Sequence, residues 1–100
     1  MSKIVSKKLQ IEYNPDFRRH FGVIWDYIAD DSLNRANGFK NQLRKLIETL
    51  EDSPYRYRQS LYYENQNVRD LIFKGYTIPY LVDKEKDLII VLDIFKWMDR

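Results

Sequence analysis

The order of patterns along the chain predicts an α+β fold in which an N-terminal helical hairpin packs on a twisted antiparallel sheet. Two long segments repeat apolar residues at helical spacing, and the later segments alternate at strand spacing between short turns. The predicted order of elements is β-α-α-β-β-β. The 100 residues, 44% of them hydrophobic, favour a single domain over residues 1–100 with one modest core.

The first predicted strand and helix follow one another without a linker. Residues 7–13 alternate apolar and polar side chains, which is typical of a half-buried strand. Asn14 suits the N-cap of a helix and Pro15 its first position. The apolar residues that follow at helical spacing form one stripe: Phe17, Phe21, Ile24, Trp25 and Ile28.

A second helix is predicted to begin immediately after the first. Asp31 or Ser32 can cap it, and Pro54 ends it, because the residue before a proline is pushed out of helical backbone. Its apolar face consists of Ala36, Phe39, Leu43, Leu46, Ile47 and Leu50. Since almost nothing separates the two helices, we expect an antiparallel hairpin.

After Pro54 the apolar spacing changes to that of a strand. Residues 55–63 are predicted to be a strand with Tyr55, Tyr57, Leu61 and Tyr63 on one face. The other face holds Arg56 and Arg58. Such a strand either packs its tyrosines on the helices and leaves its arginines in water, or it stacks bases and holds phosphates.

The last third of the chain predicts a meander of strands. Residues 67–73 and 76–82 flank Lys74–Gly75, a hairpin signal, and a charged turn leads to a last strand over 88–97. Pro79 has no backbone donor, so it should lie at a strand edge, at a bulge, or with its nitrogen facing away from a partner.

The composition excludes several classes of protein. Without cysteine, disulfides and thiolate metal sites are excluded, which fits the cytosol, and His20 as the single histidine argues against a zinc site. No apolar run is long enough to span a membrane. The net charge of +2 is too small to indicate nucleic-acid binding by itself. Residues 32–47 are nevertheless free of acids and hold four cations, which form either a solvated helix face or a basic surface: Arg35, Lys40, Arg44 and Lys45.

Four segments together resemble the RelE/ParE superfamily of type II toxin–antitoxin toxins: "IWDYIADDS", "LIETLEDSP", "NVRDLIFKGYTIPYLVD" and "LIIVLDIFKW". The resemblance implies a small protein that stops growth once its antitoxin is degraded. Many members cleave mRNA in the ribosomal A site through the RNA 2′-hydroxyl, whereas ParE-type members poison DNA gyrase. An antitoxin segment wraps and neutralises both kinds.

The resemblance directs attention to the cations and tyrosines of the C-terminal half. Catalysis of RNA cleavage would fall to Arg69, Tyr76 and Lys96, because phosphate transfer needs a base, an acid and cations. Binding of RNA or another target would fall to Arg56, Arg58, Lys74 and Trp97. Two departures weaken the nuclease interpretation: Thr77 stands where RelE-like nucleases carry a basic residue, and "FKW" stands where many carry a histidine.

Each candidate also has a plain structural explanation. Arg69 binds a phosphate or forms an ion pair with Asp70 or another nearby carboxylate, and Lys74 is simply solvated if the hairpin tip touches nothing. Lys96 points at an anionic target or an antitoxin carboxylate, or it is an ordinary polar fringe. At least one of Tyr76 and Tyr80 should pack in the core.

The same reasoning expects His20, beside Arg18 and Arg19, to be a solvated helix residue.

The sequence is interpreted first as a toxin that inhibits growth by ribosome-dependent mRNA cleavage. The alternatives are a ParE-like gyrase poison without nuclease chemistry and an antitoxin-binding module with weak or lost toxicity. All three share a cognate antitoxin as partner, docked along the helical hairpin and an exposed strand, and none requires a metal or organic cofactor. A toxin of this kind is expected in the cytoplasm. Exposed apolar surface would also allow a homodimer or a toxin–antitoxin hetero-oligomer.

Overall fold

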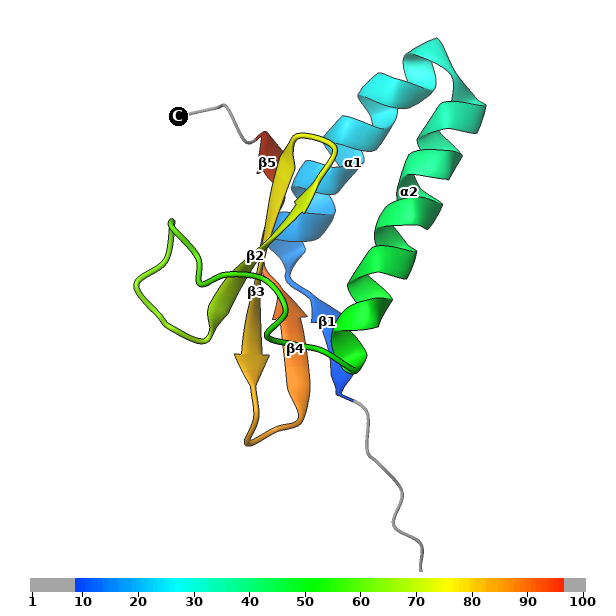
Figure 1. Ribbon diagram of the computed structural model, residues 1–100. Helices are drawn as coiled ribbons and strands as arrows, with labels where there is room; N and C mark the ends of the chain where they lie inside the picture. Colours follow the sequence, from blue (N-terminus) through cyan, green and yellow to red (C-terminus); the bar gives the residue numbers. More distant parts are fainter. Residues whose placement is uncertain (1–8, 97–100) are drawn as a thin grey trace, which may run out of the picture.

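The computed structural model describes residues 9–96 (Figure 1). The elements are β1 Gln10–Tyr13, α1 Pro15–Asp31, α2 Leu33–Glu48, a short 3₁₀ helix Thr49–Glu51, β2 Val68–Phe73, β3 Tyr76–Asp83, β4 Leu88–Val91 and β5 Phe95–Lys96. None of the helices in this range has both the length and the apolar character needed to cross a bilayer.

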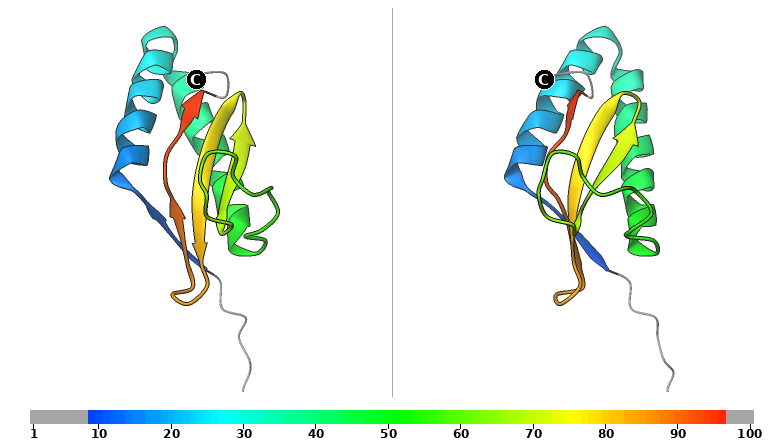
Figure 2. Two further views of the ribbon diagram at one scale, coloured as in Figure 1. Left: turned by 90° about the vertical axis from the view of Figure 1, so that its left-hand side faces the viewer. Right: turned by 60° about the vertical axis from the view of Figure 1, so that its left-hand side comes forward.

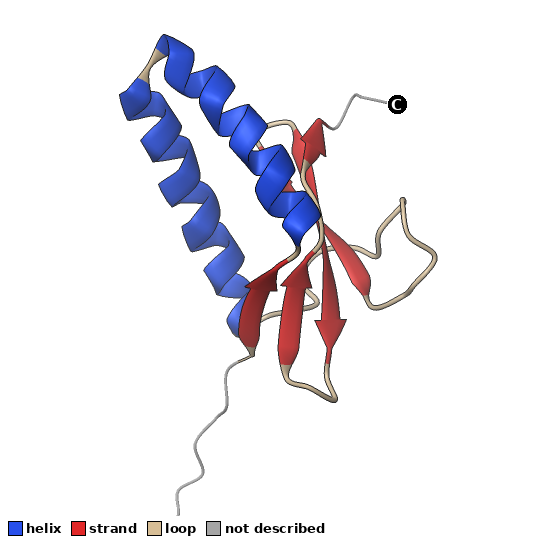
Figure 3. Cartoon of the chain, turned by 180° about the vertical axis from the view of Figure 1, so that it is seen from behind, coloured by secondary structure: helices blue, strands red, loops and turns tan. Residues whose placement is uncertain are grey.

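The predicted α+β architecture is confirmed: the helical hairpin covers one face of the sheet (Figures 2 and 3). The strand order is β1-β4-β3-β2, and β5 also pairs with β3. The sheet is mixed, however, because β1 runs parallel to β4 while the other strand pairs are antiparallel. β4 runs in the same direction as β2, because β3 is antiparallel to both of them. β4 also runs in the same direction as its other neighbour, β1.

Local capping explains where the helices begin. Asn14 Oδ1 accepts the backbone N–H of Asp16 at 2.9 Å, with Pro15 at the first helical position. Ser32 is the cap of α2, and its hydroxyl accepts the N–H of Arg35 at 3.1 Å. The predicted helix starts are therefore confirmed, with Ser32 rather than Asp31 as the second cap.

The core lies between the helical hairpin and the sheet. A row of aromatic rings crosses it, from Tyr13 through Phe17 and Phe21 to Phe39, with neighbouring centroids 5.2, 5.6 and 6.1 Å apart. Phe39 then reaches Tyr76 on β3, edge to face at 5.6 Å. The fully buried sheet residues on this face include Leu71, Ile78, Tyr80, Ile89 and Val91.

The strand predicted over 55–63 is wrong. These residues form a loop that pairs with the sheet only at one isolated bridge, Gln59 with Arg69. Before the bridge, Tyr57 lies edge-on to the core residue Tyr80 at 6.4 Å. After it, Tyr62 lies edge-on to Phe95 at 5.0 Å, on the opposite face of the sheet. The alternation of this segment therefore reflects a loop that wraps the edge of β2 and places aromatic side chains against both faces of the sheet.

The last predicted strand, 88–97, is interrupted. Residues 92–94 separate β4 from β5, and Trp97 lies outside the described residues. The N–H of Leu92 donates to the carbonyl of Pro79 at 2.8 Å, but Pro79 has no N–H to return a bond. The regular ladder stops at this position. Pro79 therefore lies in a central strand, beside an interruption of the neighbouring strand, and not at a strand edge.

The buried hydroxyl of Tyr80 gives a test of the core. Tyr80 is fully buried, its O–H donates to the carbonyl of Pro54 at 2.6 Å, and burial raises its pKa. Tyr80→Phe should lower the free energy of unfolding by about 1–2 kcal/mol, because the Pro54 carbonyl loses its donor. Urea denaturation measures this loss. Tyr27→Phe, whose side chain is 79% exposed, is the control and should change the value by less than about 0.5 kcal/mol; equal losses would contradict the role of the buried bond.

Candidate functional site

The residues that the sequence singled out fall into two groups at opposite ends of β3. Lys74, Tyr76 and Lys96 gather at the end where β3 begins, next to the β2–β3 turn. Arg69 lies at the other end, near the long loop that carries Arg56 and Arg58.

The first group is built by the pairing of β3 with β5. Lys96 pairs with Tyr76, and its ammonium lies 5.5 Å from the centre of the Tyr76 ring. Lys96 is exposed, while Tyr76 is half-buried against Phe39. The pair therefore presents a cation and a phenol at the open end of the sheet.

Lys74 extends this group at the tip of the hairpin. Lys74 and Gly75 both have positive φ, 51° and 86°, as a tight two-residue turn requires, so the predicted hairpin is confirmed. The Lys74 ammonium lies 5.7 Å from the Phe73 ring. A depression beside it is lined by Ile28, Asn34, Arg35, Gly38, Phe39, Gln42 and Lys74. Arg35 is already paired with Asp31 at 2.7 Å, which leaves the two lysines as the cations that extend from this end of the sheet.

Arg69 is held by the long loop. Its Nη1 donates to the Tyr57 carbonyl at 3.0 Å, and its guanidinium carbon lies 4.8 Å from the centre of the Tyr55 ring. The alternative of an ion pair with Asp70 is not found, because alternation places Asp70 on the other face, where its Oδ2 accepts the N–H of Leu61 at 3.0 Å. Arg69 thus fastens the loop to β2.

The two groups do not converge on one point. Arg69 is opposite Tyr80, and Tyr76 lies four residues away along β3. At ~3.3 Å per residue the backbones of Tyr80 and Tyr76 are ~13 Å apart along β3. The guanidinium of Arg69 is turned to the Tyr57 carbonyl and the Tyr55 ring, whereas the Lys96 ammonium lies over Tyr76.

Arg56 and Arg58 have structural contacts in the loop. Arg56 donates to the hydroxyl of Thr49 at 3.0 Å and lies over the Tyr57 ring at 5.6 Å. The carbonyl of Arg58 accepts the N–H of Asp70 at 3.2 Å, while its side chain is exposed. Neither arginine joins Lys74 and Lys96.

A groove between the two helices was not predicted as a site. It has a volume of about 280 Å³ and is lined by Tyr13, Phe17, Arg18, Phe21, Lys40, Leu43, Arg44 and Ile47. Its floor is apolar, and three cations stand around it: Arg18, Lys40 and Arg44. The acid-free run of residues 32–47 indicated two of these cations, Lys40 and Arg44. Arg18 lies on the other helix and joins them only because the two helices pack side by side.

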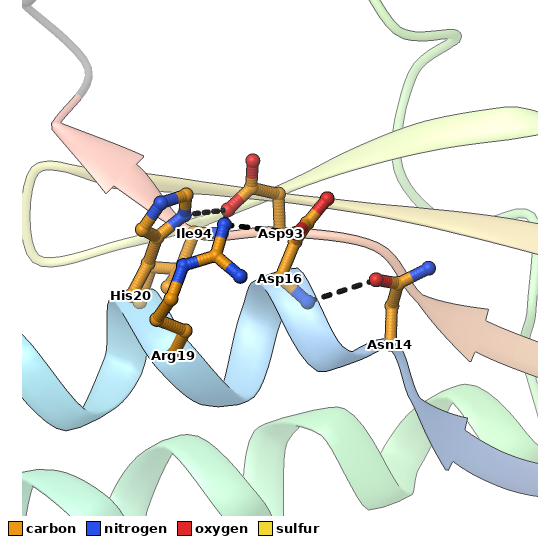
Figure 4. A network of polar contacts seen from close by, with 6 residues as sticks. All are labelled: Asn14, Asp16, Arg19, His20, Asp93 and Ile94. Carbon is orange, nitrogen blue, oxygen red and sulfur yellow. Dashed lines mark hydrogen bonds and ion pairs between the residues drawn. The ribbon is translucent and has the colours of Figure 1, made fainter.

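His20 was expected to be merely solvated, and the structure corrects this. Its Nδ1 lies 2.7 Å from Asp93 Oδ1, which joins α1 to the link between β4 and β5 (Figure 4). The same carboxylate oxygen accepts the N–H of Ile94 at 2.7 Å. Nearby, Arg19 pairs with Asp16 at 3.0 Å. Because His20 and Asp93 are 73 residues apart, no local pattern could have indicated the contact.

Burial raises the pKa of the Tyr63 phenol, and the charges of Asp93, Asp16 and Asp70 raise it further. Tyr63 is therefore neutral at physiological pH beside this acidic side of the sheet. Among residues 9–96 no three metal-ligating side chains come close enough to hold an ion.

A helical hairpin packed on a sheet is the arrangement that the sequence resemblance to RelE/ParE toxins implied. The family model for the ParE toxin of the type II toxin–antitoxin system parDE matches residues 11–97. The chain belongs to this family.

Solved structures show the same fold. The chromosomal ParDE system of P. aeruginosa aligns with a TM-score of 0.72 and 18% identity, over 91% of this chain and 98% of the other. The intact E. coli RelBE complex gives a TM-score of 0.66 and 17% identity, over 92% and 99%. The isolated E. coli RelE toxin gives 0.65 and 16%, over 92% and 87%. A comparison with curated proteins found no match.

The structural role of Arg69 can be tested against Lys74. Arg69→Met removes the bond to the Tyr57 carbonyl and the contact with the Tyr55 ring, so the free energy of unfolding should fall by about 1–2 kcal/mol. Lys74→Met, at an exposed turn, should change it by less than about 0.5 kcal/mol. Both values come from urea denaturation. A neutral Arg69→Met would show that this arginine does not hold the loop.

Proposed function

We propose that this chain inhibits bacterial growth as a ParE-type poison of DNA gyrase rather than by cutting mRNA. The observation that carries this choice is the separation of Arg69 from the Lys96–Tyr76 pair. Membership of the ParE toxin family supports the same choice, since the resemblance assigns gyrase to ParE-type members.

The chemistry of RNA cleavage explains why the separation matters. Attack by a 2′-hydroxyl needs a base, an acid and cations around one phosphate. Arg69, the best phosphate ligand among the candidates, is bound to the Tyr57 carbonyl and the Tyr55 ring, and its strand partner Tyr80 lies four residues along β3 from Tyr76, the partner of Lys96. A gyrase poison needs no such cluster, because it acts by binding.

For a binding function, the exposed end of the sheet offers what is needed. Lys96 lies over the half-buried ring of Tyr76, and Lys74 lies over the ring of Phe73, the β2 residue that pairs with Tyr76, so two cations are presented at this end of the sheet. We infer that this surface, called here the β3–β5 surface, contacts an acidic region of gyrase or its DNA. The site of action would be the bacterial cytoplasm, and no cofactor would be required.

Ribosome-dependent mRNA cleavage is the second candidate, and the Lys96–Tyr76 pair favours it. An ammonium next to a phenol can hold a phosphate and transfer a proton. The pair lacks a second cation at contact distance among the described residues, which is why this function ranks second.

We also propose a cognate antitoxin as partner, because two structures of similar fold, RelBE of E. coli and RelBE2 of Mycobacterium tuberculosis, are toxin–antitoxin complexes. The groove between α1 and α2 fits a segment with apolar residues for the floor and acidic residues for Arg18, Lys40 and Arg44. On this proposal the antitoxin and the target use different surfaces of the toxin.

Induction of the chain without its antitoxin distinguishes the targets. We expect DNA breaks trapped with gyrase and intact mRNA, with Lys96→Ala reducing breakage by about tenfold. Lys45→Ala, an exposed lysine on α2, is the control and should retain breakage. Cleaved mRNA with intact DNA would favour the second candidate, and harmless overexpression would point to a binding module that has lost toxicity.

The groove is tested by binding to the antitoxin encoded beside the toxin gene. Arg44→Glu should weaken binding by about 10- to 100-fold, because it places like charge opposite the acidic segment. Lys45→Glu makes the same charge change one residue outside the groove lining and should alter affinity by less than about threefold. Isothermal titration calorimetry measures both. Equal effects of the two substitutions would exclude the groove as the docking site.

A further inference from the structure

The short strand β5 depends on few contacts within the sheet. Within residues 9–96, two residue pairs join it to β3: Tyr76 with Lys96 and Thr77 with Phe95. The link of residues 92–94 that leads into it leaves the ladder opposite Pro79, which lacks a backbone donor. Contacts outside the ladder therefore contribute to the position of Lys96: the Tyr62 ring lies edge-on to Phe95, Ile94 is buried, and a polar contact holds the link itself.

The polar contact that holds the link joins His20 and Asp93. A carboxylate can only accept, so the Nδ1–H of His20 donates to Asp93 Oδ1, at 2.7 Å. The same oxygen accepts the N–H of Ile94, the buried residue immediately before β5. Figure 4 shows the imidazole and the carboxylate meeting between α1 and the link. Asp93 Oδ1 thus holds the backbone of the link in place and also connects the link to α1.

On α1, the residue that hydrogen-bonds to Asp93 is His20. The neighbouring charges on that helix, Arg19 and Asp16, are paired with each other at 3.0 Å. From the loop, Tyr63 is near enough for the charge of Asp93 to contribute to raising its pKa, after burial, but the hydrogen bonds that the Asp93 carboxylate accepts within residues 9–96 come from His20 and Ile94. The side chains of His20 and Asp93 are 45% and 24% exposed, so the pair is reachable by solvent and is not required as core packing.

We propose that His20 is a positioning residue: through Asp93 it holds β5 in register and so keeps Lys96 over Tyr76 on the β3–β5 surface. His20 need not touch the target. The functional part of this inference rests on the proposed role of Lys96, whereas the structural part, the control of β5 by His20, stands independently of the target.

Amide hydrogen exchange of the full-length chain tests the structural part. His20→Ala should speed the exchange of the β5 amides by about five- to tenfold, the effect of losing one charge-assisted hydrogen bond, while the β2 amides stay within about twofold of the original. Arg19→Ala, which removes the neighbouring ion pair on α1, is the matched control and should leave β5 unchanged.

Rescue by a smaller side chain separates positioning from chemistry at the imidazole. Asparagine places an N–H close to where Nδ1 of histidine lies, so His20→Asn should restore both slow exchange in β5 and growth inhibition. His20→Ala should need about five- to tenfold more toxin for the same inhibition, with antitoxin affinity unchanged because the groove is elsewhere.

The outcomes are separable. Wild-type exchange in His20→Ala would overturn the inference, and so would full loss of inhibition in His20→Asn with β5 ordered, because the imidazole itself would then be required. Fast exchange in β5 together with intact DNA after induction would support the positioning role and would reject only the gyrase target.

Discussion

The missing N–H of Pro79 is the constraint on which the arrangement of the β3–β5 surface depends. Pro79 accepts from Leu92 but cannot donate back, so the last strand leaves the ladder after β4. The chain is then free to turn Asp93 toward His20 and to bury Ile94 before it pairs with β3 again. One absent donor in the central strand thus leads to the position of Lys96 over Tyr76.

Two surfaces with different chemistry each present positively charged side chains. The groove between the helices combines an apolar floor with arginine and lysine, which suits a folded peptide segment that brings both apolar and acidic residues. The β3–β5 surface is smaller and presents lysines beside one tyrosine. The two surfaces share no residue among those described, so on the proposed function substitutions can alter neutralisation by the antitoxin and action on the target separately.

Features encoded within a few residues were predictable from the sequence. Asn14 and Ser32 cap the helices that they were expected to cap, and Lys74–Gly75 forms the expected turn, because each depends only on neighbouring backbone. The segment 55–63 misled because wrapping an edge gives the same alternation as a strand. The broken last strand and the His20–Asp93 contact depend on residues far apart in the chain, so alternation within 88–97 could not indicate them. The role of Arg69 could not be decided from the sequence for the same reason. The Tyr57 carbonyl that holds its side chain belongs to the segment 55–63, which was predicted to be a strand.

Site-specific photo-crosslinking in cells tests most directly whether the target and the antitoxin contact different surfaces of the toxin. A photoreactive residue at position 96 should form an adduct with a gyrase subunit when the toxin is induced alone, and one at position 44 should form an adduct with the antitoxin when both are expressed. The account would be contradicted if position 96 captured ribosomal proteins or the antitoxin, or if position 44 captured gyrase.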